Sequence, residues 1–291
     1  MIFGTTFSHP YIRDHFKLSV RKAFTELLNL KLSLVRLSCY WSEVEKEPGE
    51  YDFGEIAELL KMAQKAEQKI VLIIGMKAVR WPEFYVPKWT NYEEVIKNPS
   101  QLLTYIEQAL LLANKFSCVK YLQIENEPLD KSGPNKLTVP LRVLTKEIQL
   151  ARELSSLPIV LTMWGNVSLK DSRLRVLDKL GDIIGLDLYY QIPDGKGGYW
   201  GPKDSIETLQ KQIIKVNKPV WITELQTNPW KGEENLTSLE VFENNFSQAR
   251  HLPVEAILFW GFEYWYYLKS KKDSIIWNYI HDLKTKLFFN N

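Results

Sequence analysis

KYLQIENEPLD, residues 120–130, contains the end of a short apolar run that gives way abruptly to Glu125, Asn126 and Glu127. KPVWITELQTNPW, residues 218–230, has the same pattern, because its apolar run ends at Glu224. Parallel α/β proteins place their chemistry in the loops at the carboxyl ends of buried strands. The two segments therefore predict a parallel α/β fold with a carboxylate at each of two strand ends.

The rest of the chain alternates between apolar runs and segments with helical periodicity. The runs are nearly continuous, which is typical of parallel strands buried on both faces. Between them, apolar residues recur at i, i+3, i+4 and i+7. The predicted strands are residues 2–7, 32–37, 70–74, 119–124, 159–162, 183–188, 220–223 and 256–260. The predicted helices are residues 56–63, 102–110, 141–154, 174–180, 206–216, 236–250 and 274–287.

This alternation predicts an α/β fold, a single (β/α)8 TIM barrel that spans residues 1–291 as one catalytic domain. No composition break, low-complexity tract or longer repeat marks a second domain. A doubly wound open sheet is the alternative. It would need a glycine-rich phosphate turn after its first strand, and the segment 4–8, GTTFS, does not supply one.

Composition narrows the classes of function. The net charge is +2 and the basic residues are scattered, which argues against a nucleic-acid partner. Two cysteines, Cys39 and Cys118, provide no disulfide framework and are expected in the interior. The opening MIFGTTFSHP is no signal peptide, and no apolar run reaches the ~20 residues of a membrane span. We expect a cytoplasmic protein without a membrane partner, or a secreted one if a leader has been removed.

The two strand-end glutamates suit the cleavage of a glycosidic bond, in which one carboxyl protonates the leaving oxygen and one carboxylate attacks the anomeric carbon. In the retaining version of this reaction the two groups lie ~5–5.5 Å apart. Glu125 is a rival to Glu127, since residues two apart in a strand share a face. Arg36 lies inside an apolar run and needs a carboxylate partner, either Glu224 or another strand-end acid.

Polar and aromatic residues at the other strand ends predict a site for a neutral polyhydroxylated ligand, because aromatic faces pack on sugar C–H faces. The candidates for substrate binding are His9, Trp41, Trp81, Trp164, Asp187, Trp230, Trp260 and Glu263. Lys77 and Arg80 are expected on a solvated loop. No second His or Cys joins His9 at ligand spacing, so the sequence predicts no metal site.

Several of these residues resemble glycoside hydrolase clan A, the retaining (β/α)8 hydrolases, over essentially the whole chain. Asn126-Glu127-Pro128 resembles the acid/base motif of the clan, and Glu224 in WITELQ resembles its nucleophile. Arg36 in LVRLS and Trp260 match the clan's arginine of the second strand and tryptophan of the eighth. The resemblance implies that Glu127, rather than Glu125, is the acid/base, and that Glu125 pairs structurally.

Two further stretches carry the resemblance. WSEVEKEPGEYDF, residues 41–53, is similar to the segment after the second strand in families 42 and 5. DIIGLDLYY, residues 182–190, is similar to the sixth strand of family 2, which implies that Tyr189 hydrogen-bonds the nucleophile. The expected activity is retaining hydrolysis of β-linked oligo- or polysaccharides without a cofactor. A transglycosidase, a non-catalytic carbohydrate-binding barrel and a metal-dependent sugar isomerase or phosphate-processing barrel are the alternatives.

Overall fold

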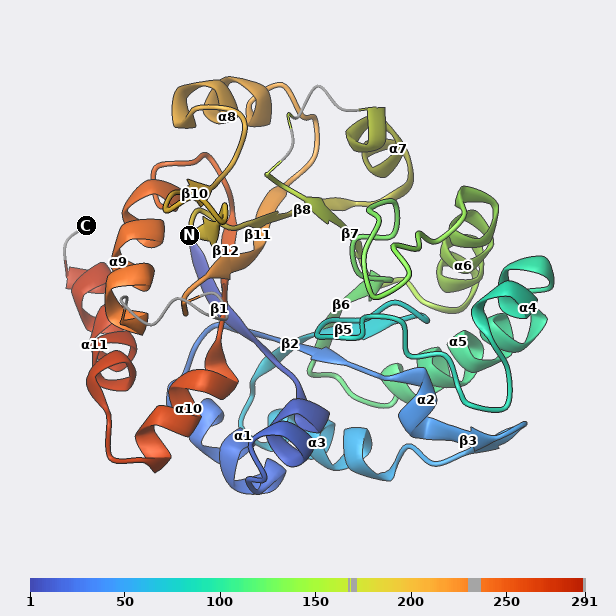
Figure 1. The fold of residues 1–291 in the computed structure, drawn as a ribbon. Coiled ribbons are helices and arrows are strands. Elements are labelled where there is room, and N and C mark those ends of the chain that lie inside the picture. Colours follow the sequence, from blue (N-terminus) through green and yellow to red (C-terminus); the bar gives the residue numbers. More distant parts are fainter. Residues whose placement is uncertain (167, 169–171, 230–236, 290–291) are drawn as a thin grey trace.

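Eight parallel strands form a single closed barrel with helices around it in the computed structural model, which describes residues 1–166, 168, 172–229 and 237–289 (Figure 1). The strand order around the barrel is β1-β2-β5-β6-β7-β8-β11-β12, with β12 pairing back to β1. The predicted TIM barrel is therefore confirmed, and the open sheet is excluded. The barrel strands are β1 (Ile2–Phe7), β2 (Leu34–Ser38), β5 (Lys69–Ile74), β6 (Val119–Ile124), β7 (Ile159–Trp164), β8 (Ile183–Leu188), β11 (Val220–Gln226) and β12 (Ala256–Trp260).

The helices lie on the outside of the barrel (Figure 1). They are the π-helix η1 (Tyr11–His15), then α1 (Val20–Asn29), α2 (Trp41–Val44), α3 (Gly54–Lys65), α4 (Tyr92–Lys97), α5 (Ser100–Ala113), α6 (Leu141–Leu154), α7 (Ser172–Leu180), α8 (Ile206–Ile213), α9 (Ser238–Ala249), α10 (Phe262–Ser270) and α11 (Ile275–Phe289). Two small antiparallel hairpins follow barrel strands: β3 (Glu45–Glu47) with β4 (Glu50–Tyr51), and β9 (Ile192–Pro193) with β10 (Tyr199–Trp200).

Some boundaries differ from the predicted ones. The strand predicted over 220–223 extends to Gln226, so Glu224 lies inside β11 rather than after it. Helix α1 was not predicted, although Ser19 caps it by accepting a hydrogen bond from Lys22 N and its buried face includes Phe24 and Leu27. Helix α10 was missed because it begins immediately after β12, with only Gly261 between them.

Successive side chains of a strand point alternately into and out of the barrel, so the inward-facing side chains of the strands form layers in its interior. An apolar cluster that includes Leu34, Val160, Ile183 and Trp221 joins the strands near their amino ends. Two residues further along, the same strand faces carry Arg36, Thr162, Gly185 and Thr223, so polar groups lie above the apolar layer. A Cβ at Gly185 would overlap Thr162 and Thr223, so glycine makes room there for the two hydroxyl-bearing side chains.

Candidate active site

Glu224 reaches the interior through an irregularity in β11. Thr223 and Glu224 are neighbours, and in a regular strand they would face opposite sides. The register between β11 and β8 shifts between Ile222 and Glu224, and Glu224 then pairs with Asp187. A bulge of this kind re-aims a side chain. Thr223 and Glu224 both contact interior groups as a result.

Both oxygens of the Glu224 carboxylate accept a hydrogen bond. Arg36 Nη2 donates to Oε1 at 2.5 Å, and the Tyr189 hydroxyl donates to Oε2 at 2.5 Å. Because β2 is not adjacent to β11, the contact with Arg36 crosses the interior of the barrel, whereas Tyr189 follows the neighbouring strand β8. The buried guanidinium of Arg36 thus has Glu224 as its ion-pair partner, one of the two possibilities that the sequence left open.

Two further hydrogen bonds of Arg36 tie this ion pair to strands β1 and β6. Nε donates to Thr6 Oγ1 at 2.9 Å, and Nη1 donates to Gln123 Oε1 at 3.2 Å. The amide nitrogen of Gln123 in turn donates to Asn126 Oδ1 at 3.1 Å. A buried charge is tolerated when its hydrogen bonds are satisfied in this way. The network therefore connects Glu224 to the loop that carries Glu127.

Glu127 follows β6 on a backbone that is held by several hydrogen bonds. Its φ is 43°, and the φ of Glu125 is 60°, both in the left-handed region that side chains rarely adopt. Such strain costs roughly 1–3 kcal/mol per residue and persists only where the surroundings fix it. Here Glu127 N donates to Thr162 Oγ1 at 2.7 Å, and Lys77 Nζ donates to the carbonyls of Glu127 at 2.6 Å and Asp130 at 2.9 Å.

Lys77 is fully buried, so its expected place on a solvated loop was wrong. Its ammonium group serves as a clamp on the loop from Glu127 to Asp130. In the sequence, the one indication of a role in the site is that Lys77 follows barrel strand β5 by three residues, at the carboxyl end of the strand. Its partners are backbone carbonyls of the next βα loop, and no sequence pattern identifies those.

The environment of Glu127 favours the protonated acid. Only 8% of the residue is exposed, and this burial raises the pKa of its carboxyl well above the ordinary value. The negative charges of Asp187, Glu224 and Asp130 raise the pKa further, whereas the Lys77 ammonium lowers it. Glu224, in contrast, is bonded by two donors. Burial and negative charge therefore surround Glu127, whereas two hydrogen-bond donors surround the carboxylate of Glu224.

Glu125 is held away from Glu127 by a separate set of contacts. Its carboxylate accepts from Met76 N at 2.9 Å and Lys77 N at 2.5 Å. The fully buried carboxyl of Glu147 on α6 lies beside it, close enough for a hydrogen bond when one of the two carries a proton. Gly75, with φ of 142°, is required beside it, since a Cβ there would overlap the Glu125 carboxyl. Glu125 is thus a structural residue that joins two βα loops and a helix.

The Glu125–Glu147 pair makes the free energy of unfolding depend on pH. Burial is the main cause that raises the pKa of Glu125 from 4.5 to about 7. Below pH 4.5 the carboxyl is protonated in both states. As the pH rises towards 7 the unfolded chain ionises and the folded one does not, so stability falls, by on the order of 3 kcal/mol. Glu147→Gln removes the second buried carboxyl, whose pKa burial and the neighbouring Glu125 raise well above the ordinary value, so we expect a smaller fall in this variant.

Urea unfolding of both proteins between pH 4.5 and pH 8 measures this difference. Glu153→Gln is the matched control, because Glu153 lies exposed on the same helix. An identical pH dependence in wild type and Glu147→Gln would contradict the assignment of a protonated pair.

Residues predicted to bind substrate differ in where the structure places them. Trp164 and Trp260 lie half-buried beside the carboxylates: Trp164 stacks on Tyr189 at 5.1 Å, and the Arg80 guanidinium lies 3.9 Å from the centre of the Trp260 ring. Trp81 follows β5 on a loop and is 68% exposed. Trp230 lies outside the described residues.

Glu263, Trp41 and His9 are committed to other contacts. Fully buried Glu263 accepts from Ser8 N at 2.5 Å and forms an ion pair with Arg80, which was expected on a solvated loop and is largely buried instead. Trp41 has no exposed surface, packs on Tyr105 and donates to Glu45 Oε2. Their placement argues against contact with a substrate.

His9 is buried with its ring against Tyr40, and its Nε2 lies 3.7 Å from Glu55 Oε2. Burial, together with the nearby charge of Arg13, lowers the pKa of His9 to about 3, so the imidazole is neutral. It lines a small polar cavity of about 120 Å³ whose walls include Arg13, Glu43 and Glu55. The carboxylates of Glu127 and Glu224 are not part of that wall.

Tyr199 and Trp200 were missed by sequence reasoning. They are 44% and 63% exposed and form strand β10 of the hairpin that follows β8. The signal was the segment GGYWG, residues 197–201, in which glycines flank two aromatic residues within a βα loop. Exposed aromatic side chains on such loops are suited to stacking on an extended ligand.

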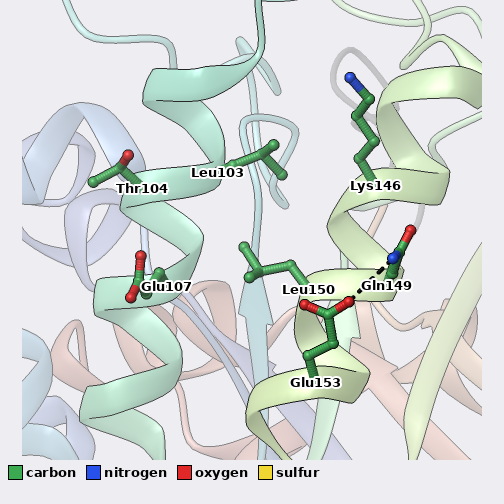
Figure 2. Close-up of a pocket in the computed structure, with 7 residues that line it drawn as sticks. All are labelled: Leu103, Thr104, Glu107, Lys146, Gln149, Leu150 and Glu153. Atoms are coloured by element: carbon green, nitrogen blue, oxygen red, sulfur yellow. Dashed lines mark hydrogen bonds between the residues drawn. The ribbon is translucent and has the colours of Figure 1, made fainter.

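An open groove of about 270 Å³ lies elsewhere, between α5 and α6 on the outside of the barrel (Figure 2). Leu103 and Leu150 point into it, and Glu107, Lys146 and Glu153 stand along its sides (Figure 2). It contains none of the residues around Glu127 and Glu224. The described part of the chain has no cluster of three or more His, Cys, Asp or Glu residues suited to a metal ion. Among the same residues, no helix is long and apolar enough to cross a membrane.

No protein-family model and no curated protein sequence matches this chain. Its fold, however, matches solved structures. A GH5_18 protein from Streptomyces cattleya in complex with Manβ1-4GlcNAc superposes with a TM-score of 0.65 at 13% identity, over 89% of this chain and 70% of that one. The exo-β-1,4-mannosidase Op5Man5 from Opitutaceae bacterium strain TAV5 gives a TM-score of 0.63 at 12% identity, over 89% and 52% of the two chains.

A β-glucosidase from Exiguobacterium marinum also matches, with a TM-score of 0.56 at 12% identity, over 89% of this chain and 88% of that one. At these identities the likeness establishes the shared barrel fold. Because the barrel hosts many chemistries, the activity has to be argued from the site itself.

Proposed function

We propose that this chain, as one catalytic barrel over residues 1–291, is a retaining glycoside hydrolase that cleaves β-linked oligosaccharides. The observation that carries the proposal is the pairing of unlike carboxyls: Glu224 accepts hydrogen bonds from Arg36 and Tyr189, while burial and neighbouring anions raise the pKa of Glu127. Carboxyls with such opposed environments are the requirement for an acid and a nucleophile at one pH. The glycosidase names of proteins with the same fold support the proposal.

In the first step a Glu224 oxygen attacks the anomeric carbon while Glu127 gives its proton to the leaving oxygen, and the glycosidic bond breaks. Arg36 and Tyr189 hold the attacking carboxylate in place. In the second step Glu127, now ionised, takes a proton from water as the water oxygen attacks the same carbon. The bond to Glu224 then breaks and the carboxylate is restored.

Asn126, directly before Glu127 in the chain, has a proposed role as well. Its side-chain oxygen is occupied by Gln123, which fixes the amide next to Glu127. Hydrogen bonds to the sugar 2-hydroxyl strengthen in the transition state of this reaction. We propose that the amide of Asn126 provides one.

The exposed aromatic residues support a substrate of several sugars. Trp81 follows β5 and Trp200 follows β8, so they lie on loops at the carboxyl ends of strands, where the carboxylates also lie. Platforms on two separate loops suit a chain of sugars better than a single terminal residue. One of the matching structures binds the disaccharide Manβ1-4GlcNAc, which makes β-mannosides a natural first group to test.

The test is a screen of aryl β-glycosides alongside β-linked glucan, mannan, xylan and galactan oligomers of increasing length. We expect hydrolysis of at least one series, with kcat/KM rising with chain length. In Trp81→Ala the increase in kcat/KM from the shortest to the longest oligomer should be roughly 3- to 10-fold smaller than in wild type. The reason is that an aromatic contact contributes about 0.5–1.5 kcal/mol. Phe53→Ala, at a partly exposed aromatic residue directly before α3 in the segment after the second barrel strand, is the control. Activity confined to monosaccharide glycosides would contradict the extended site.

A further inference from the structure

Asp187 is a fully buried carboxyl at the centre of the site, and the steps above do not use it. It lies on β8, directly beside Glu224 of β11 on one side and Trp164 of β7 on the other. The sequence predicted it as a substrate-binding residue. With no exposed surface, it faces protein groups instead.

Each oxygen of Asp187 has a different neighbour. Thr223 Oγ1 donates to Oδ1 at 2.6 Å. Oδ2 is buried, and no donor among the described residues bonds it. The acidic group beside the Asp187 carboxyl is that of Glu127, close enough for a side-chain hydrogen bond when one of the two carries a proton. Two ionised carboxylates repel each other at such a separation, so the contact requires a proton between them.

From this juxtaposition, and resting on the proposed function, we infer that Asp187 is the positioning residue for the acid/base: it shares one proton with Glu127 and so holds that residue as an acid until the leaving oxygen takes the proton. Thr223, brought to the interior by the bulge in β11, orients Asp187 for this contact. The role differs from that of Arg36 and Tyr189, which bond Glu224.

The proton balance of the two steps follows. In the resting enzyme the pair holds one proton and one negative charge. When Glu127 gives its proton to the leaving oxygen, two adjacent buried carboxylates remain, an arrangement that strongly favours recovering a proton. Glu127 recovers it from the water that attacks the glycosyl-enzyme, and the pair returns to its starting charge. The same contact therefore strengthens Glu127 as a base in the second step.

The other charged groups around the pair are consistent with a single shared proton. Glu224 on β11 and Asp130 after β6 add negative charge near Glu127, and Lys77 after β5 adds positive charge. Near Asp187, Glu224 adds negative charge and Arg36 on β2 adds positive charge. Burial and these anions raise the pKa values of both Glu127 and Asp187, which keeps the proton on the pair at neutral pH.

Two substitutions should shift the pH at which Glu127 loses its proton, one downwards and one upwards. Asp187→Asn removes the neighbouring charge and keeps the shape, so Glu127 should lose its proton at lower pH, and the basic limb of the kcat/KM profile should shift down by about one unit or more. Thr223→Val removes the donor to the Asp187 carboxylate, so the pair should keep its proton to higher pH and the limb should shift up. Asp182→Asn, at the amino end of β8 and partly exposed, is the control and should leave the limb in place.

The profiles are measured with an aryl β-glycoside that has a poor leaving group. A second readout needs no turnover: titration of carboxyl-¹³C-labelled Asp and Glu by NMR should show two coupled steps for the pair in wild type and one step, at lower pH, in Asp187→Asn. Unshifted limbs in both variants, or independent titration of Glu127 and Asp187, would overturn the inference. If Asp187→Asn does not fold, the Thr223→Val shift and the wild-type titration decide. Absence of glycoside turnover in every protein would contradict the proposed function and leave the titration as the test of the pair.

Discussion

Glu224→Ala should lose turnover by a factor on the order of 10⁴ or more, because no other group can form the glycosyl-enzyme. Both donors that bond Glu224, Arg36 and Tyr189, remain in the variant and line the space left by the carboxylate. Azide can enter that space and attack the anomeric carbon of an activated substrate directly. The expected product is a glycosyl azide of inverted configuration, identified by NMR.

Glu243→Ala is the matched control, since Glu243 lies exposed on α9. It should keep wild-type activity with and without azide. Loss of activity without azide rescue, in a Glu224→Ala protein with a wild-type circular dichroism spectrum, would argue that Glu224 has a structural role only.

Glu127→Ala should depend on the leaving group instead. With a poor leaving group, kcat/KM should fall by about 10²–10⁴-fold, the usual contribution of general acid catalysis. With a good leaving group, the glycosyl-enzyme still forms, because little protonation is needed. Its breakdown becomes slow, since the base is missing as well.

Azide also separates the two roles by stereochemistry. In Glu127→Ala it attacks the glycosyl-enzyme formed by Glu224, so two displacements take place and the glycosyl azide has retained configuration. The basic limb of the pH profile should disappear in the same variant, because burial and the anions around Glu127 set it. The same azide product from Glu127→Ala and Glu224→Ala would show that the roles are assigned wrongly.

The barrel could be predicted from the sequence because each buried strand is encoded locally, as a short run of apolar residues. Apolar runs such as 119–124 and 183–188 match β6 and β8 residue for residue. Glu127 and Glu224 stand out because each interrupts such a run with a charge. The missed α1 shows the limit: Ala23, Phe24 and Leu27 form its buried face, but its start depends on the cap at Ser19.

The contacts within the site could not be predicted in this way, because they join residues far apart in the chain. The bulge that turns both Thr223 and Glu224 inward leaves no mark in the composition of β11. The charged segment that contains Lys77 and Arg80 is typical of a solvated loop. In the structure, however, Lys77 donates hydrogen bonds to backbone carbonyls and Arg80 forms an ion pair with Glu263. Tertiary partners satisfy these charges, and only the folded chain supplies them.

The stereochemistry of hydrolysis tests the central claim most directly. With an aryl β-glycoside that the screen identifies as a substrate, ¹H NMR during the first minutes of reaction follows the anomeric proton of the released sugar before mutarotation. A covalent intermediate on Glu224 requires two inversions, so the account predicts the β-anomer as the first product. First appearance of the α-anomer would mean a single displacement by water, and it would contradict the assignment of Glu224 as nucleophile.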